Sequence, residues 1–179
     1  MRRMVALFLI VWVSILLAGC EIVGSSEADD DTEGQPAIQT DKKAYTVGFT
    51  DLFMELTVEM RYTNRTRRIV YLPRCLVVHS PILEKLEDGE WVFAYAPVVS
   101  LCLGPPVVVM PDAPYAYTFE MHAGLRSNNL HPKFIPDEVE GVYRLAWEIY
   151  RTWQPDNRPG LGTLLPLEQR ISNTFRLVE

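Results

Sequence analysis

The chain has 179 residues, of which 48% are hydrophobic and 22% charged, and its formal net charge is −6 at pH 7. This acidic balance lacks the basic surface that nucleic-acid binding requires, so we expect no nucleic-acid partner. It also disfavours electrostatic attraction to anionic lipid, so any affinity for a membrane has to come from another part of the chain.

The first segment, residues 1–19, has three parts. Arg2 and Arg3 precede an apolar run from Val5 to Leu17, and small residues then lead to Cys20. The run is shorter than the roughly 20 residues that span a bilayer, and this order of parts is typical of a secretory signal peptide. An ordinary cleaved signal and an uncleaved anchor helix are the alternatives.

The end of this segment, Leu17-Ala18-Gly19-Cys20, resembles the lipobox of bacterial lipoproteins. The resemblance implies that the chain is cut before Cys20, that the Cys20 thiol carries a diacylglycerol group, and that the new amino terminus is often acylated too. Two or three acyl chains anchor a protein stably, whereas one binds reversibly. We therefore expect a lipid-anchored protein of the bacterial cell envelope, with its domain in the periplasm or at the exterior. Glu21 favours the outer membrane in a host that has one.

Residues 20–40 have the composition of a disordered acidic tether that begins with the lipidated cysteine. Residues 21–40 contain six acidic side chains and no basic one. Such a segment buries too little apolar surface to fold, and its like charges extend it. The run Asp29-Asp30-Asp31 lacks the spaced ligands and the turn glycine of a calcium loop, so it indicates solvated linker. Removal of residues 1–19 leaves 15 basic and 23 acidic side chains, a net charge of −8.

Residues 41–179 amount to one domain with the pattern of short β-strands. Apolar and polar residues alternate in three segments, which predicts half-buried strands: Leu52–Tyr62, Tyr115–Met121 and Gly141–Tyr150. Asp88-Gly89 separates two further apolar segments and predicts a tight hairpin. With no amphipathic helix in the pattern, we expect an all-β fold, an immunoglobulin-like antiparallel β-sandwich of about seven to nine strands.

Part of this domain resembles known immunoglobulin-like modules of bacteria. The segments that carry the resemblance are Leu56–Asn64, Leu83–Trp91 and Gly141–Leu145. The domain is weakly similar to the bacterial intracellular proteinase inhibitor-type module, and this resemblance implies a proteinase inhibitor as one possible function. Gly141-Val142-Tyr143 resembles the Gly-x-Tyr of an immunoglobulin F strand, whose tyrosine can bond to the backbone. Leu145 stands where the second core cysteine of a true immunoglobulin domain would lie.

Two cysteines remain after lipidation, Cys75 and Cys102. In an exported domain two thiols fit one disulfide, and two buried free cysteines are the alternative. The spacing excludes a CxxC redox pair, and no third cysteine remains for a zinc cluster.

No catalytic motif stands out in the chain. His79, His122 and His131 are far apart and lack the spacing of metal ligands, and the Gly-x-Ser-x-Gly pattern of a nucleophile elbow does not occur. We therefore expect no catalytic residue, no metal site, no cofactor and no enzymatic activity.

If the domain binds a partner, its long loops are the expected contact surface, because strands form a rigid frame and connections vary. Two connections exceed what a hairpin needs, 122–136 and 153–166. Their candidate binding residues are Arg126, Asn128, Asn129, His131, Trp153, Asp156, Asn157 and Arg158. Tyr150 is also a candidate for exposure.

The arginines Arg65, Arg67, Arg68 and Arg74 form a local basic cluster. They are either a patch for an anion or partner, or turn residues that pair with Glu55 and Glu59, and the second interpretation is preferred.

Three functions follow from these observations. The first is a lipid-anchored extracytoplasmic binding or accessory module without catalytic activity, attached to the membrane through Cys20 and contacting an envelope protein. The second is a proteinase inhibitor, and the third is an envelope enzyme that uses scattered carboxylates or histidines.

Overall fold

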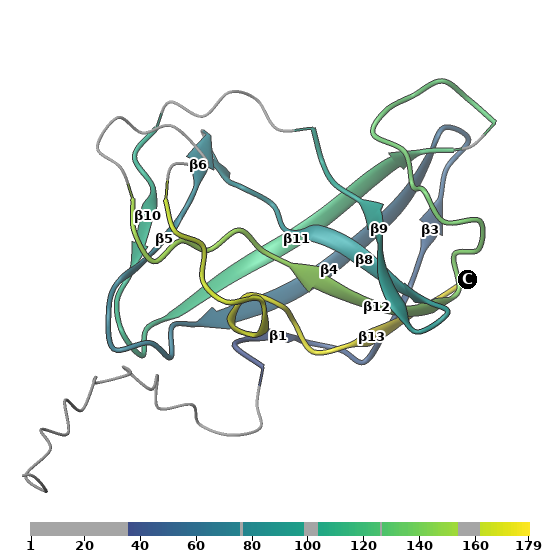
Figure 1. The fold of residues 1–179 in the computed structure, drawn as a ribbon. Coiled ribbons are helices and arrows are strands. Elements are labelled where there is room, and N and C mark those ends of the chain that lie inside the picture. The colour runs from purple at the N-terminus through teal and green to yellow at the C-terminus, as the bar shows by residue number, and fades with distance from the viewer. Residues whose placement is uncertain (1–35, 76, 99–103, 126, 154–161) are drawn as a thin grey trace, which may run out of the picture.

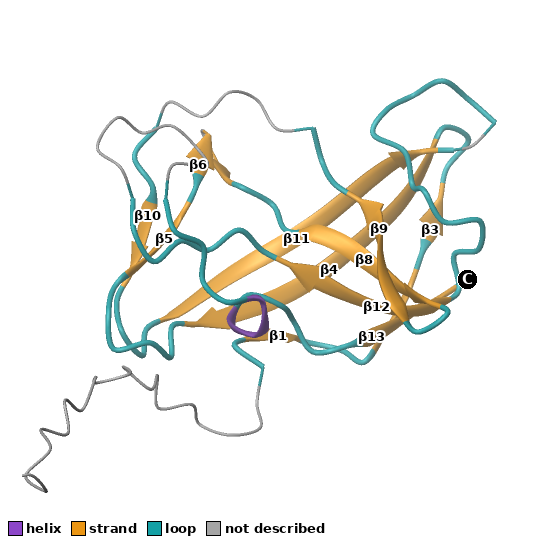
Figure 2. Ribbon diagram, viewed as in Figure 1, coloured by secondary structure: helices purple, strands orange, loops and turns teal. Residues whose placement is uncertain are grey.

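The computed structural model describes residues 36–75, 77–98, 104–125, 127–153 and 162–179. In these ranges the regular elements are strands, apart from the 3-10 helix Leu167–Gln169, so the expected all-β class is confirmed (Figure 2). The strands number thirteen in the described chain rather than seven to nine, because several have only two or three residues.

The first main sheet is built on the long strand β4 (Phe53–Thr63). Strand β11 (Pro114–Gly124) runs antiparallel to β4 along its whole length, with Thr118 opposite Glu59. The other side of β4 pairs with β1 (Ile38–Thr40) and, further along, with β3 (Gly48–Phe49). The order across the sheet is therefore β1-β4-β11.

The second main sheet has five strands in the order β2-β13-β12-β8-β9. Their bounds are Ala44–Thr46, Phe175–Val178, Gly141–Ala146, Ile82–Glu87 and Glu90–Tyr95. Neighbours are antiparallel except for β2 and β13, which are parallel. Two small pairs complete the fold, β5 (Val70–Leu72) with β10 (Val107–Val109) and β6 (Arg74–Cys75) with β7 (Val77–Val78).

The two main sheets lie against each other as a sandwich-like pair of layers (Figure 1). The inner face of β4 is the predicted one, because Met54, Leu56, Val58, Met60 and Tyr62 are all buried. Across the layers the aromatic rings interlock: Trp147 contacts the rings of Tyr115 and Tyr117, and Tyr95 meets Phe119 edge to face. Packing of these apolar stripes against each other is the main source of stability of such a fold.

The predicted hairpin is confirmed, with β8 and β9 joined at Asp88 and Gly89. Both residues have positive φ, 51° and 87°, as a two-residue turn between twisted strands requires. Asn64 ends β4 in a second turn, and its amide Nδ2 donates to the carbonyl oxygens of Arg68 and Val109, each at 2.9 Å. The Asn64 segment is thus a turn.

The Gly141-Val142-Tyr143 segment makes the backbone contact that its resemblance suggested. The Tyr143 hydroxyl donates to the carbonyl oxygen of Val139 at 2.6 Å, and the ring is fully buried. Glycine is needed two residues earlier, because a Cβ at Gly141 would lie 2.8 Å from Cε of Lys85. Lys85 is itself buried and donates to the carbonyl oxygen of Glu138 at 2.7 Å.

Four expectations from the sequence differ from the structure. The tether was expected to reach Thr40, but Ile38–Thr40 form β1 and Ile38 is fully buried, because it pairs with Tyr62 and with Ser172. The first long connection was expected to begin at His122, but β11 continues to Gly124.

The other two differences concern the end of β12. The strand was expected to reach Tyr150, but it stops at Ala146. Tyr150 was expected to be exposed, yet only 3% of it is accessible. The cause is that its backbone bonds to Tyr71 and bridges to Leu164, so this segment is covered on both sides.

The predicted disulfide between Cys75 and Cys102 remains a prediction, since Cys102 lies outside the described residues.

Candidate functional site

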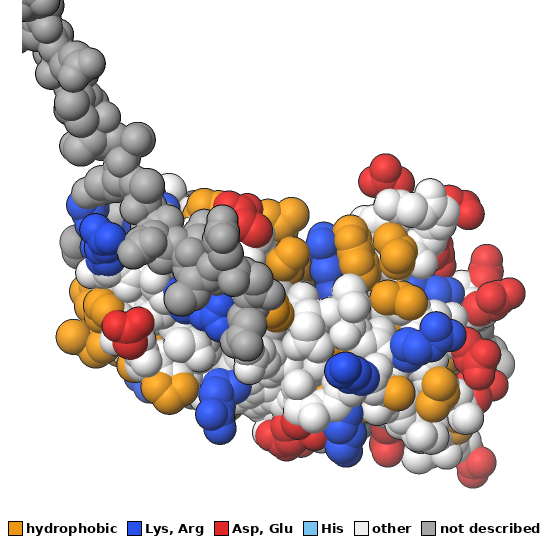
Figure 3. Space-filling view, turned by 90° about the horizontal axis from the view of Figure 1, so that it is seen from below, with side chains coloured by type: hydrophobic (Ala, Val, Ile, Leu, Met, Phe, Trp, Pro, Cys, Tyr) orange, Lys and Arg blue, Asp and Glu red, His pale blue; other side chains and the backbone are white. Residues whose placement is uncertain are grey.

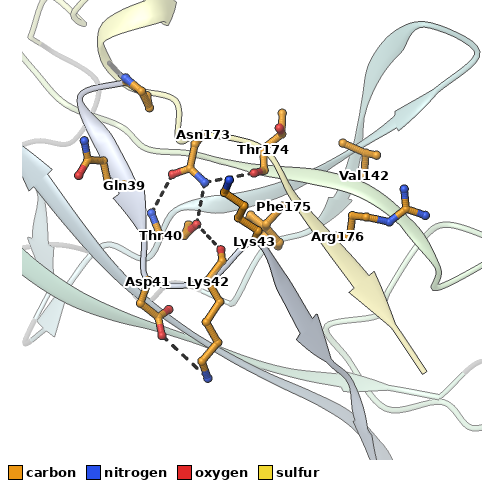
Figure 4. A pocket seen from close by; sticks show the side chains of 11 residues that line it. Gln39, Thr40, Asp41, Lys42, Lys43, Val142, Asn173, Thr174, Phe175 and Arg176 are labelled. Carbon is orange, nitrogen blue, oxygen red and sulfur yellow. Dashed lines mark hydrogen bonds and ion pairs between the residues drawn. The ribbon is translucent and has the colours of Figure 1, made fainter. Parts of the chain in front are cut away.

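A polar groove of about 850 Å³ lies beside β1 and β13, at the point where the described chain begins (Figure 4). Residues 39–43 form one side of it and residues 173–176 the other. The side chains that line it are Pro36, Gln39, Thr40, Asp41, Lys42, Lys43, Val142, Asn173, Thr174, Phe175 and Arg176. Polar and charged groups from both sides converge there, so this groove is a candidate ligand site.

Asn173 ties the two sides of the groove together. Its Oδ1 accepts the Thr40 backbone N–H and its Nδ2 donates to Thr40 Oγ1, both at 2.8 Å. The Asn173 backbone N–H also donates to the Ile38 carbonyl oxygen at 3.2 Å. These three bonds cover the outer edge of β1, so its free backbone groups are used within the chain.

The charge of the groove is positive, in a protein whose overall charge is negative. Asp41 is its one acidic lining residue, and Asp41 lies 3.9 Å from Lys42 Nζ and accepts the Tyr45 hydroxyl at 2.6 Å. Lys43 and Arg176 are exposed, and no ion pair with a described residue engages either side chain. Basic side chains are spread over the middle of the face seen in Figure 3, and acidic ones gather toward its right end. The groove therefore suits a carboxylate or another anion.

Tyr45 stiffens the wall of the groove. Its hydroxyl donates to Asp41 and accepts the Lys42 backbone N–H at 3.0 Å, and Lys42 Nζ lies 5.7 Å from the centre of the ring. Burial first, and then the bond to the Asp41 carboxylate, raise the pKa of Tyr45 to about 12. Tyr45 is therefore a neutral donor at physiological pH.

The structure places part of the first predicted loop on the surface. Asn129 and His131 are exposed, while Asn128 is held, because its Nδ2 donates to the Leu52 carbonyl oxygen at 2.8 Å. Lys133 Nζ donates to the Asn128 carbonyl oxygen at 2.6 Å and closes the loop. Arg126 lies outside the described residues.

Of the second predicted loop, the structure describes Trp153, which is half-buried and meets Tyr150 edge to face at 5.7 Å between ring centres. Asp156, Asn157 and Arg158 lie outside the described residues.

The histidines are distributed over three places. His79 Nδ1 lies 3.9 Å from a carboxylate oxygen of Glu148, and a hydrogen bond from His79 lowers the pKa of Glu148. His122 lies 3.5 Å from Glu55 on the outer face of the first sheet, and His131 is exposed. Within the described ranges no group of three histidine, cysteine or acidic residues could hold a metal ion.

Comparisons with protein-family models, with curated protein sequences and with solved structures found no match to this chain. No helix in the described part of the chain is long and apolar enough to cross a membrane. What the structure defines is an all-β, sandwich-like domain with a cationic groove at its N-terminal end.

Sequence reasoning missed the groove. Lys42-Lys43 directly after an acidic segment is a local signal that could have suggested one side of it. The other side, Asn173 and Arg176, lies more than 130 residues further along, and only the pairing of β13 with β2 brings it there.

Proposed function

We propose that this protein is a lipid-anchored, non-catalytic binding module of the bacterial cell envelope. The observation that carries the proposal is the sequence Leu17-Ala18-Gly19-Cys20 behind a short apolar run. Acylated Cys20 would hold the chain to a membrane, preferably the outer membrane in a host with two, and the domain would face the periplasm or the exterior.

The groove is the proposed contact surface for an envelope protein partner. No described acidic side chain pairs with the cationic groups of Lys43 and Arg176. Lys42 lies near Asp41, but the Asp41 carboxylate also accepts the Tyr45 hydroxyl. An exposed acidic segment of the partner would complement this charge, and such complementarity raises the association rate and selects against basic partners.

The strand order supports an immunoglobulin-like assignment. Strands β13, β12, β8 and β9 have the neighbours of strands G, F, C and C′ of a variable-type domain, and β1, β4 and β11 those of A, B and E. Tyr143 occupies the corner position near the start of the F-like strand. Modules of this kind serve chiefly in recognition, although fold alone does not fix function.

Crosslinking in native envelopes tests the proposal. The full chain and two charge-reversal variants would be treated with a short amine- and carboxyl-reactive crosslinker, and the adducts identified by mass spectrometry. We expect the parent chain to capture one defined envelope protein through an acidic segment. Lys43→Glu combined with Arg176→Glu should reduce that adduct by about tenfold, a loss equal to roughly 1.4 kcal/mol of binding.

Arg74→Glu is the matched control. It also reverses a basic side chain, on β6 and within the arginine cluster noted in the sequence, but outside the groove. If Arg74→Glu abolishes the adduct and the groove variant does not, the contact surface lies at the arginine cluster. If neither chain captures a reproducible partner, the binding function itself is wrong.

A proteinase inhibitor is a second proposed function, favoured by one observation. The exposed segment Asn129–His131 lies on a loop that hydrogen bonds of Asn128 and Lys133 fix in place. A segment that is ordered before binding loses less entropy when it binds. Titration of the purified chain against serine and cysteine proteinases would show stoichiometric inhibition. Inhibition of none of them would rule this function out.

A further inference from the structure

Strand β11 is paired on one side only. All eleven of its residues lie opposite β4, from Pro114 to Gly124, and no other described strand pairs with it. In the immunoglobulin-like arrangement the neighbour of this strand would be strand D. In this protein β10, which precedes β11 in the chain, pairs with β5 instead. The outer edge of β11 is thus left without a strand.

The direction of the backbone groups on this edge follows from two bonds near its end. The His122 N–H points to the Tyr95 hydroxyl at 3.4 Å, and the Gly124 N–H donates to the Pro132 carbonyl oxygen at 2.8 Å. Both bonds leave β11 away from β4. Because direction alternates along a strand, the even-numbered residues of β11 present their N–H and C=O groups outward.

Three residues therefore carry an outward N–H and an outward C=O that both lack a partner in the described chain: Ala116, Thr118 and Glu120. Their side chains are exposed, and no hydrogen bond joins their outward N–H or C=O groups to the rest of the described chain. The side chains of Tyr115 and Tyr117 point inward against Trp147, which keeps the strand in place. We call these three residues the open edge.

The open edge has little of the usual protection against strand pairing. Natural edges carry charged side chains, above all lysine, or proline, an inward charge, a bulge or a short strand, and Glu120 is the one charged side chain of the open edge. β11 has no lysine or arginine, its one proline is its first residue, and its register with β4 runs without a shift. The edge of β9 differs, because the Ile135 N–H donates to the Ala94 carbonyl oxygen and β8–β9 contains a register shift.

We propose that the open edge pairs with the open edge of a second copy of this chain, antiparallel, about a two-fold axis at Thr118. In this register Thr118 faces Thr118 of the second copy, and Ala116 faces Glu120. The outward N–H and C=O groups of Ala116, Thr118 and Glu120 in each chain then find a partner. Pro114 has no N–H, and the His122 N–H already bonds to Tyr95, so the pairing does not extend to these two residues.

Charge supports this register. Ala116 lies directly opposite Arg61 in β4, so Arg61, Ala116 and Glu120 of the second copy fall in one row across the joined sheet. The Cα atoms of Arg61 and that glutamate would be about 9.5 Å apart, two strand spacings, with only the small alanine side chain between them. Arg61 is exposed and has no ion pair with any described residue. Two equivalent ion pairs would form, one on each side of the axis.

The pairing would join two four-stranded sheets, each made of β1, β3, β4 and β11, into one sheet of eight strands. An edge of this length buries less than the roughly 1,200 Å² of a standard stable interface, so association should be weak in dilute solution. It should be stronger where many chains share a membrane, a consequence that rests on the proposed function. The pairing itself does not depend on the lipid.

Cysteine crosslinking tests the proposal in the full chain. Thr118→Cys places two thiols on the two-fold axis, where mild oxidation should give a disulfide-linked dimer on a non-reducing gel. Thr57→Cys is the matched control, since it is exposed on the same face but lies in β4, away from the axis. We expect at least tenfold more dimer from Thr118→Cys, over the background of the parent chain. Adding Ala116→Pro, which removes an outward N–H, should lower that yield about tenfold.

A charge swap tests the register and does not rely on proline. In the Thr118→Cys background, Arg61→Glu should reduce the dimer several-fold, and adding Glu120→Arg should restore it. Within one chain these two residues are not opposite each other, so restoration requires the second copy.

No excess of dimer over the Thr57→Cys control, a crosslink to a chain of another mass, or no restoration by the swap would each overturn the proposal. Membrane fractionation of the same samples reports on the anchor separately, so a failed anchor and a failed pairing are distinguishable.

Discussion

The two edges of the β1-β4-β11 sheet differ in how far their outward backbone groups are hydrogen-bonded. At β1, Asn173 and its backbone satisfy the outward groups of Thr40 and Ile38, and a groove with cationic walls results. At β11, no described residue bonds to the corresponding groups of Ala116, Thr118 and Glu120. The difference teaches that one sheet can offer two kinds of contact, side-chain charge at one edge and backbone pairing at the other.

The outer edge of β1, which we call the closed edge, is covered by residues far along the chain. No described residues cover the open edge in this way. β1 is covered because residues 172–173 return beside it before β13 begins. β11 has no such return, since β10 turns away to pair with β5.

The largest effect should come from Trp147→Ala, which removes the support of the open edge. Trp147 is fully buried against Tyr115 and Tyr117, and its Nε1 donates to the His79 carbonyl oxygen at 2.5 Å. Urea unfolding should show a loss of about 3–5 kcal/mol. Phe93→Ala, at a half-exposed position of β9, is the control and should cost less than about 1 kcal/mol. Equal losses would show that Trp147 does not hold the layers together.

Asn173→Ala should open the closed edge. It removes the side-chain bonds to the Thr40 backbone and hydroxyl, so we expect a loss of about 1–2 kcal/mol and faster hydrogen exchange at the Thr40 amide. Asn129→Ala changes an exposed asparagine for which no hydrogen bond is present in the described chain, and should leave both readouts unchanged. Unchanged exchange at Thr40 in Asn173→Ala would contradict the role given to Asn173.

Tyr143→Phe should weaken the domain without touching either edge. It deletes only the hydroxyl that donates to the Val139 carbonyl oxygen, at a cost of about 1 kcal/mol. Tyr71→Phe is a matched control, because no hydrogen bond of the Tyr71 hydroxyl is present among described residues. The Thr118→Cys dimer yield should be the same in both backgrounds, and a change specific to Tyr143→Phe would mean that the corner acts on the open edge.

The smallest effect should be an alkaline weakening near the groove. Tyr45 loses its proton at a pKa near 10 when unfolded but at about 12 in the folded domain, so between these values the unfolded state binds fewer protons. Its contribution to stability is therefore complete below pH 10 and is lost as the pH rises toward 12. Unfolding free energies measured across that range should fall less steeply in Tyr45→Phe than in the parent. Identical slopes would remove Tyr45 as a cause.

Local patterns predicted the frame of the fold well. The alternation of Leu52–Tyr62 gave β4 and its buried face, and Asp88-Gly89 gave the hairpin, because both depend on neighbouring residues alone. The backbone contact of Tyr143 was implied by the resemblance of Gly141-Val142-Tyr143 to the Gly-x-Tyr of an immunoglobulin F strand, and its donor and acceptor are four residues apart.

The parts that failed depend on distant residues. Ile38–Thr40 were assigned to the tether because their neighbours are polar, and their burial comes from Tyr62 and Ser172. Tyr150 was expected at the surface because the alternating pattern places it on the face opposite to Tyr143 and Trp147. In the structure its backbone pairs with that of Tyr71, which covers it. The groove and the open edge could not be predicted, since each is defined by which strands become neighbours rather than by any motif.

The proposal that this is a lipid-anchored module is tested most directly by Cys20→Ala in the full chain. Cells grown with labelled fatty acid would be separated into membrane and soluble fractions, and the domain's unfolding would be measured in each. We predict that the parent is labelled and membrane-bound, and that Cys20→Ala loses the label and leaves the membrane fraction while its unfolding free energy is unchanged. A Cys20→Ala chain that stays labelled or membrane-bound like the parent would contradict the account.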